Sequence, residues 1–93
     1  MKTNNVRQEI LTAAINHYGE DSQQLKAIEE LSELIRALAR CDDQDNIAEE
    51  MADVRIMLDQ LEIIFHNRDR VRQYELRKLK RLSDRLHVAD TVN

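Results

Sequence analysis

The chain has 93 residues, of which 34% are charged and 42% apolar, and its net charge is -4. This length corresponds to one small domain, which buries only a modest share of its surface, so association with copies of itself is expected. One glycine and no proline disfavour β-hairpin folds, because hairpin turns need these residues. The alanine, leucine, glutamate and arginine content instead predicts a single all-α domain over residues 1–93, frayed at its first few residues and at 88–93.

The apolar segments give no indication of a membrane span or an export signal. No apolar run approaches the ~20 residues that cross a bilayer, and the N-terminus leads into a polar helix without an apolar signal core. The single cysteine, Cys41, cannot form an internal disulfide and fits a reducing compartment. We therefore expect a cytoplasmic protein without membrane contact.

The first two helices are expected on either side of the only glycine. The first runs over residues 5–18 and ends at Gly19, a natural C-terminal stop. Its expected apolar stripe consists of Val6, Ile10, Ala13, Ala14 and Tyr18. The second begins at Asp21 or Ser22, either of which can cap it, and runs to Arg40.

The next two helices follow an acidic loop. Residues 42–46 are acidic or amide side chains, which suit the positive end of a helix dipole. A third helix is expected over 47–65, with Met51 and Met57 in the core, and a break at His66 and Asn67 precedes a fourth helix over 69–86.

Two copies of the pattern Glu-Glu-x-x-acid lie on the second and third expected helices, at Glu29, Glu30, Glu33, Glu49, Glu50 and Asp53. At ~100° per residue, Glu50 falls in the middle of the apolar stripe of its helix with Asp53 beside it, whereas Glu49 points to the polar side. Glu30 borders the apolar arc of the second helix.

Ordinary surface salt bridges explain Glu50 badly, because no cation lies three or four residues from it. Burying neighbouring carboxylates is costly unless they are protonated or a cation lies among them. His17, His66 and His87 do not have the Glu-x-x-His spacing of a di-iron site, so all-oxygen ligands favour Mg²⁺ or Mn²⁺.

The fourth helix carries a row of basic side chains. Lys78, Arg81 and Arg85 share one edge of its apolar arc, at three- and four-residue spacing. We interpret this trio as phosphate-binding, with a solvated flank or salt bridges to the acidic helices as the alternative. Nucleic-acid binding is disfavoured, because the chain lacks an aromatic platform and a duplex-reading motif and is acidic overall.

These acids lie in two longer strings, Ala-Ile-Glu-Glu-Leu-Ser-Glu-Leu-Ile at 27–35 and Asn-Ile-Ala-Glu-Glu-Met-Ala-Asp-Val at 46–54. Both strings resemble the motif of the MazG-like, all-α nucleoside triphosphate pyrophosphohydrolases. The resemblance covers about residues 18–86, and the basic C-terminal helix makes the chain most similar to short phage or prophage members.

The resemblance implies a four-helix MazG-like bundle that hydrolyses a ribo- or deoxynucleoside triphosphate to the monophosphate and pyrophosphate, with Mg²⁺ or, as a substitute, Mn²⁺. It implies metal ligands at Glu30, Glu33, Glu50 and Asp53. It also implies phosphate contact from Lys26 and contact with the base from Gln24. We assign acceptance of the water's proton to Glu33, because this residue lies furthest from the apolar arc.

The third helix is apolar over more than half of its circumference, which is more than a lone 93-residue bundle covers. We therefore expect a homodimer or homotetramer to complete the bundle. The competing hypothesis is a non-catalytic helical interaction or adaptor protein, of phage or regulatory origin, whose acids only decorate its surface.

Overall fold

The computed structural model describes the backbone of residues 2–88 and the side chains of residues 6–88. All regular structure in this part of the chain is helical, in the order α1 (Lys2–Tyr18), α2 (Glu20–Ala39), α3 (Gln44–Phe65) and α4 (Arg68–Leu86). The prediction of an all-α fold with four helices is confirmed. None of these helices is long and apolar enough to cross a membrane. The fraying predicted for 89–93 lies outside the described residues.

The single glycine separates α1 from α2 as predicted. Gly19 has a φ of 95°, and its N–H donates to the carbonyl oxygen of Ile15 at 2.8 Å. The predicted capping of α2 is wrong, because α2 begins at Glu20 and Gly19 holds the N-cap position without a side-chain hydrogen bond. Asp21 instead lies in the first turn, where its charge meets the positive end of the helix dipole.

The acidic loop supplies the cap that starts α3. The Asp43 carboxylate accepts a hydrogen bond from the backbone N–H of Asn46 at 2.9 Å, so α3 begins at Gln44, three residues before the predicted start. At the other end, His66 adopts a left-handed conformation with a φ of 52° and turns the chain into α4. The predicted break at this position is confirmed.

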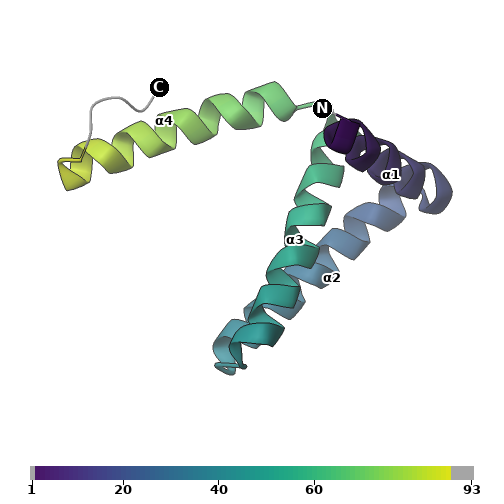
Figure 1. Ribbon diagram of the computed structural model, residues 1–93, viewed down its shortest axis with the longest axis horizontal. Coiled ribbons are helices and arrows are strands. Elements are labelled where there is room, and N and C mark those ends of the chain that lie inside the picture. Colours follow the sequence, from purple (N-terminus) through teal and green to yellow (C-terminus); the bar gives the residue numbers. More distant parts are fainter. Residues whose placement is uncertain (1, 89–93) are drawn as a thin grey trace.

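The core lies where α2 and α3 run antiparallel and α1 packs against both (Figure 1). Its buried apolar residues are Leu11, Ile15, Ala27, Ala37, Val54, Met57 and Ile64. The predicted stripe of α1 is wrong, since Val6, Ile10 and Tyr18 are exposed and the helix buries Leu11 and Ile15 instead. Met51, which was also expected in the core, is exposed.

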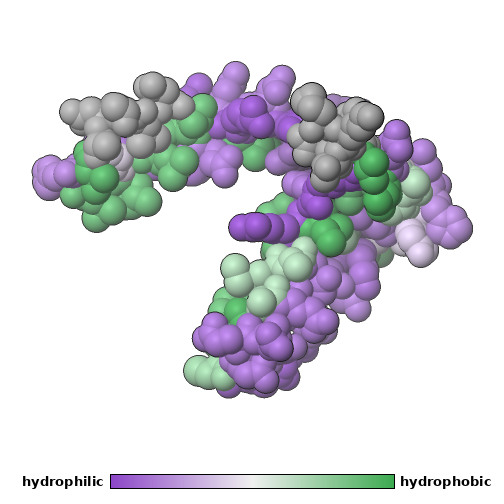
Figure 2. All heavy atoms as spheres, in the orientation of Figure 1, coloured by the Kyte–Doolittle hydropathy of each residue, from purple (hydrophilic) through white to green (hydrophobic). Residues whose placement is uncertain are grey.

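The fourth helix extends away from the other three as an arm (Figure 1). Among the described helices, α4 packs only against α3, at the corner where the two meet. Its five apolar stripe residues are between 37% and 60% exposed: Val71, Leu76, Leu79, Leu82 and Leu86. Figure 2 shows apolar side chains on the side of α4 that faces the concave space below it. One chain by itself therefore leaves the expected bundle incomplete.

The arm also leaves part of α2 uncovered. Ile28, Ile35 and Leu38 are large apolar residues of this helix, yet all three are exposed. Only small or polar residues of α2, namely Gln23, Ala27 and Ala37, are buried. Small side chains such as Ala27 and Ala37 leave room for a close approach of neighbouring helices, and this approach positions the acidic residues described below.

We expect the substitution Ala37→Leu to lower the free energy of unfolding by about 1–3 kcal/mol, because overpacking a filled site forces neighbours to shift. Ala37 is only 1% exposed, so the added side-chain atoms would have to fit inside the core. The measurement is urea unfolding at one fixed protein concentration. Ala39→Leu, at an exposed position of the same helix, is the matched control and is expected to change stability by less than about 0.5 kcal/mol. Equal midpoints for the two variants would contradict the packing.

Candidate metal site

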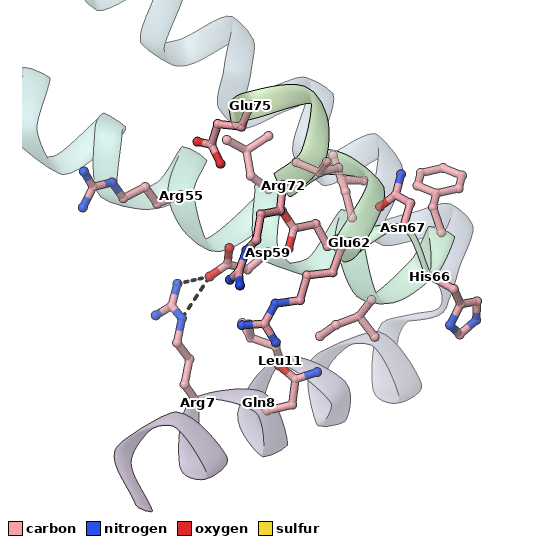
Figure 3. A pocket seen from close by; sticks show the side chains of 16 residues that line it. Arg7, Gln8, Leu11, Arg55, Asp59, Glu62, His66, Asn67, Arg72 and Glu75 are labelled. Carbon is pink, nitrogen blue, oxygen red and sulfur yellow. Dashed lines mark hydrogen bonds and ion pairs between the residues drawn. The ribbon is translucent and has the colours of Figure 1, made fainter. Parts of the chain in front are cut away.

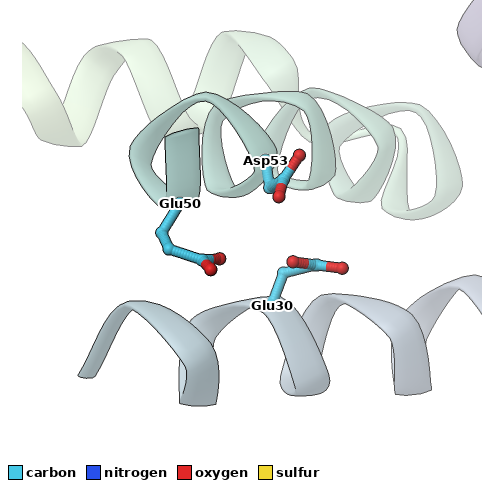
Figure 4. A group of neighbouring side chains, drawn as sticks. All are labelled: Glu30, Glu50 and Asp53. Carbon is cyan, nitrogen blue, oxygen red and sulfur yellow. The ribbon is translucent and has the colours of Figure 1, made fainter. Parts of the chain in front are cut away.

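Three carboxylates converge across the seam between α2 and α3. Glu30 points from α2 toward Glu50 and Asp53, which point from α3 (Figure 4). Each residue offers one oxygen, and these oxygens all lie within 4.8 Å of one another. All three residues are half-buried, and the side chain of Glu30 is only 14% exposed. We call Glu30, Glu50 and Asp53 the acidic trio.

Local helix geometry and helix pairing together build the trio. Glu50 and Asp53 are three residues apart and therefore share one side of α3. The antiparallel packing of α2 brings Glu30 opposite them. Ala27, one turn before Glu30, is buried and offers no bulk that would push the helices apart. The convergence is thus a property of the α2–α3 pair and does not need α1 or α4.

The trio is poorly compensated by positive charge. Lys26 forms ion pairs with Glu30 at 3.2 Å and with Glu29 at 3.5 Å. The hydrogen bond to Glu30, followed by the charge of Glu29, raises the pKa of Lys26. Among the described side chains, no lysine, arginine or histidine forms an ion pair with Glu50 or Asp53.

The surroundings of Glu50 raise the pKa of its carboxyl group. Partial removal from water raises it above 4.5, and the nearby negative charges of Glu33, Asp53, Glu30 and Glu49 raise it further. A carboxyl group in such surroundings either takes up a proton or attracts a cation. An all-oxygen set of this kind fits a hard divalent ion such as Mg²⁺.

The fourth predicted ligand, Glu33, lies outside the trio. It is one turn beyond Glu30 on α2 and accepts a hydrogen bond from Arg36 at 2.8 Å. Its charge still affects the site, because after desolvation it is the largest cause of the raised pKa of Glu50. Glu33 therefore lies next to the site and forms its own ion pair, with Arg36.

A pocket of about 660 Å³ adjoins the trio. Its lining includes Glu30 and Asp53, the predicted phosphate ligand Lys26, the aromatic ring of Tyr18, and the amides of Gln23 and Gln60. The predicted base contact, Gln24, does not line this pocket. Sequence reasoning missed Gln23, although its spacing from Ala27 and Glu30 places it on the same face of α2.

The basic trio of α4 is not brought to this site within the chain. Lys78, Arg81 and Arg85 are exposed on the arm, which packs only against α3 near its start. A second hollow, of about 940 Å³, lies where α1, α3 and α4 meet (Figure 3). Basic and acidic side chains both line this hollow, and Arg7 donates a hydrogen bond to Asp59 at 2.6 Å. The charges in the hollow therefore compensate one another, unlike those of the acidic trio.

Comparison of the chain with protein-family models, with curated proteins and with solved structures gave no match. The interpretation of the site therefore rests on its own geometry. That geometry consists of three converging carboxylates with a shortage of positive charge, beside a pocket that also contains a lysine. Such a site can bind a cation and an anion side by side.

In chelator, we expect the melting temperature to rise as the pH is lowered from about 7.5 to about 5. The folded chain holds the Glu50 proton more tightly than the unfolded chain does, because its pKa is raised on folding. The resulting stability is present at low pH and is lost as the pH rises through the raised pKa. Scanning calorimetry at several pH values measures the effect.

Glu50→Gln removes the titrating group, so its pH dependence is expected to be shallower than that of the wild type. Glu49→Gln removes the same charge from the adjacent, exposed position, and among the four acids that raise the pKa of Glu50 the contribution of Glu49 is the smallest, so this variant should flatten the slope less than Glu50→Gln does. Identical slopes for the wild type and Glu50→Gln would show that Glu50 is not held in an unfavourable electrostatic environment.

Proposed function

We propose that this chain is a Mg²⁺-dependent nucleotide pyrophosphohydrolase, which converts a nucleoside triphosphate to the monophosphate and pyrophosphate. The observation that carries the proposal is the convergence of Glu30, Glu50 and Asp53 beside a pocket that contains Lys26. The donor set fits Mg²⁺, with Mn²⁺ as a substitute. When bound, the ion would neutralise phosphate charge and lower the pKa of the attacking water.

In this proposal each residue has a separate task. The acidic trio binds the ion, and Lys26 contacts the phosphate chain with an ammonium group that already lies 3.2 Å from Glu30. Glu33 accepts the proton of the attacking water or completes the ligand set. Its ion pair with Arg36 does not prevent either task, because exposed pairs of this kind contribute only about 0–1 kcal/mol.

The proposed reaction is a displacement at the α-phosphorus. The water oxygen forms a bond to this phosphorus, and the bond to the bridging oxygen of pyrophosphate breaks with its electron pair. The water proton passes to a carboxylate. Pyrophosphate leaves, and the monophosphate retains the base and sugar.

We also propose that two or four copies complete the MazG-like bundle. The arm α4 carries eight basic and three acidic residues, whereas α2 and α3 together carry eleven acidic and three basic residues. Laying the arm of one copy on the α2–α3 pair of another would cover apolar surface on both and match opposite charges. It would also bring Lys78, Arg81 and Arg85 toward the phosphates of a bound nucleotide.

We expect the wild type to release pyrophosphate from at least one ribo- or deoxynucleoside triphosphate in Mg²⁺ and not in chelator. Glu50→Gln is expected to lower kcat by about 100-fold or more, since it removes a charge at the reacting centre. Glu49→Gln is the matched control and should retain activity. Monophosphate must appear in equal amounts.

Two results would count against the proposal. Equal pyrophosphate release by Glu50→Gln would indicate a contaminating phosphatase. Folded protein that neither releases pyrophosphate nor gains thermal stability from millimolar Mg²⁺ would favour the adaptor hypothesis.

Sedimentation is expected to find the wild type as a dimer or tetramer, and Leu79→Lys is expected to shift it toward the monomer. Leu79 lies in the exposed apolar stripe of α4, and a charge there would be costly to bury. Gln73→Lys adds the same charge elsewhere on α4 and should leave the assembly intact. A wild type that remains monomeric at high concentration would contradict the proposed assembly.

A further inference from the structure

Two amide side chains are buried against each other between α2 and α3. Gln23 is 7% exposed and Gln60 is 4% exposed, and Nε2 of Gln23 donates a hydrogen bond to Oε1 of Gln60 at 2.7 Å. Apolar side chains would fill this place at lower cost, because every buried polar atom needs a partner. The pair therefore calls for an explanation beyond simple packing.

The mutual hydrogen bond does not involve Oε1 of Gln23, which is an acceptor, or Nε2 of Gln60, which is a donor. Neither atom is enclosed, since Asn67 Oδ1 is the one buried and unpartnered side-chain polar atom among the described residues. Gln23 and Gln60 both line the 660 Å³ pocket beside the acidic trio. Both residues of the pair thus contribute to the wall of that pocket, and their unused amide atoms are not sealed from solvent.

The pair lies at a fixed distance from the acidic trio. Gln23 precedes Glu30 by seven residues, and Gln60 follows Asp53 by seven residues on the antiparallel helix. Seven residues span two helical turns, or about 10 Å along either axis. The pocket therefore has carboxylates and Lys26 toward one end and an amide donor and acceptor toward the other, which leaves room for a sugar between them.

We propose that the Gln23–Gln60 pair binds the base of the nucleotide, an inference that rests on the proposed function of the acidic trio. Every nucleobase presents a donor next to an acceptor on its pairing edge, which is the pattern complementary to the two unused amide atoms. The two amides can turn over together and keep their mutual hydrogen bond, so the pair offers its donor and acceptor in either order. The pair therefore favours nucleotides over phosphate chains that lack a base, and it accepts bases with either an amino or a keto group on the pairing edge.

The test compares the wild type with the double variant Gln23→Met and Gln60→Met. Methionine keeps the length and flexibility of glutamine, and replacing both partners leaves no amide orphaned. We expect the KM for nucleoside triphosphates to rise about tenfold or more, with kcat within about threefold of the wild type. Inhibition by inorganic tripolyphosphate, which has no base, is expected to be unchanged.

Gln44→Met is the matched control, because Gln44 is exposed at the start of α3 and does not line the pocket. It should leave the KM unchanged. If the pair serves only to fix the register of α2 against α3, the double variant will weaken tripolyphosphate inhibition and Mg²⁺ stabilisation as much as nucleotide binding. That result would overturn the proposal.

Failure of the proposed function is distinguishable from failure of this inference. If the wild type releases no pyrophosphate, calorimetric titration with nucleoside monophosphates in Mg²⁺ still measures binding of the base. Binding that is at least tenfold weaker in the double variant than in the wild type would support the amide pair. Equal binding by the two proteins, or no binding by the wild type, would overturn it.

Discussion

Electrostatic repulsion at the seam between α2 and α3 is the constraint on which the other features of this chain depend. Three carboxylates lie within 4.8 Å of one another, and the pKa of Glu50 is raised by desolvation and by its acidic neighbours. Folding therefore brings these groups together at a cost in free energy. Apolar packing of Val54, Met57 and Ala27 between the same helices offsets this cost, so the stable core and the unfavourable site occupy one interface.

The same interface explains why so few large residues are buried. Two of the three buried residues of α2 that face the core are alanines, and the third is a glutamine held by a partner on α3. Small side chains leave space for close approach of the helices, and close approach is what carboxylates on opposite helices need in order to share one cation. A bulkier seam would be more apolar, but it would separate Glu30 from Asp53.

The helices could be predicted well from the sequence, because the periodicity of apolar residues and the residues that end a helix are local features of the chain. The break at Gly19 follows from glycine's access to positive φ, and the pairing of Glu50 with Asp53 follows from three-residue spacing. The apolar stripe of α1 and the exposure of Met51 could not be predicted in this way, because they depend on where a neighbouring helix lies. Gln23 and Gln24 are equally polar, and spacing distinguishes them only once the packing of α2 against α3 shows that the face with Ala27 and Glu30 is the one that lines the pocket.

Lys26 connects the electrostatics of the pocket with its proposed use. Among the described side chains, Lys26 is the one that forms an ion pair with the trio, and it is shared between Glu29 and Glu30. A bound cation would compete with Lys26 for Glu30, while the phosphates of a nucleotide would offer the ammonium group a new anionic partner. The two exchanges favour each other, because the cation would replace the positive charge of Lys26 at Glu30 and the phosphates would bind the ammonium group that is released. In the proposed function, such coupling would make joint binding of cation and nucleotide more favourable than binding of either alone.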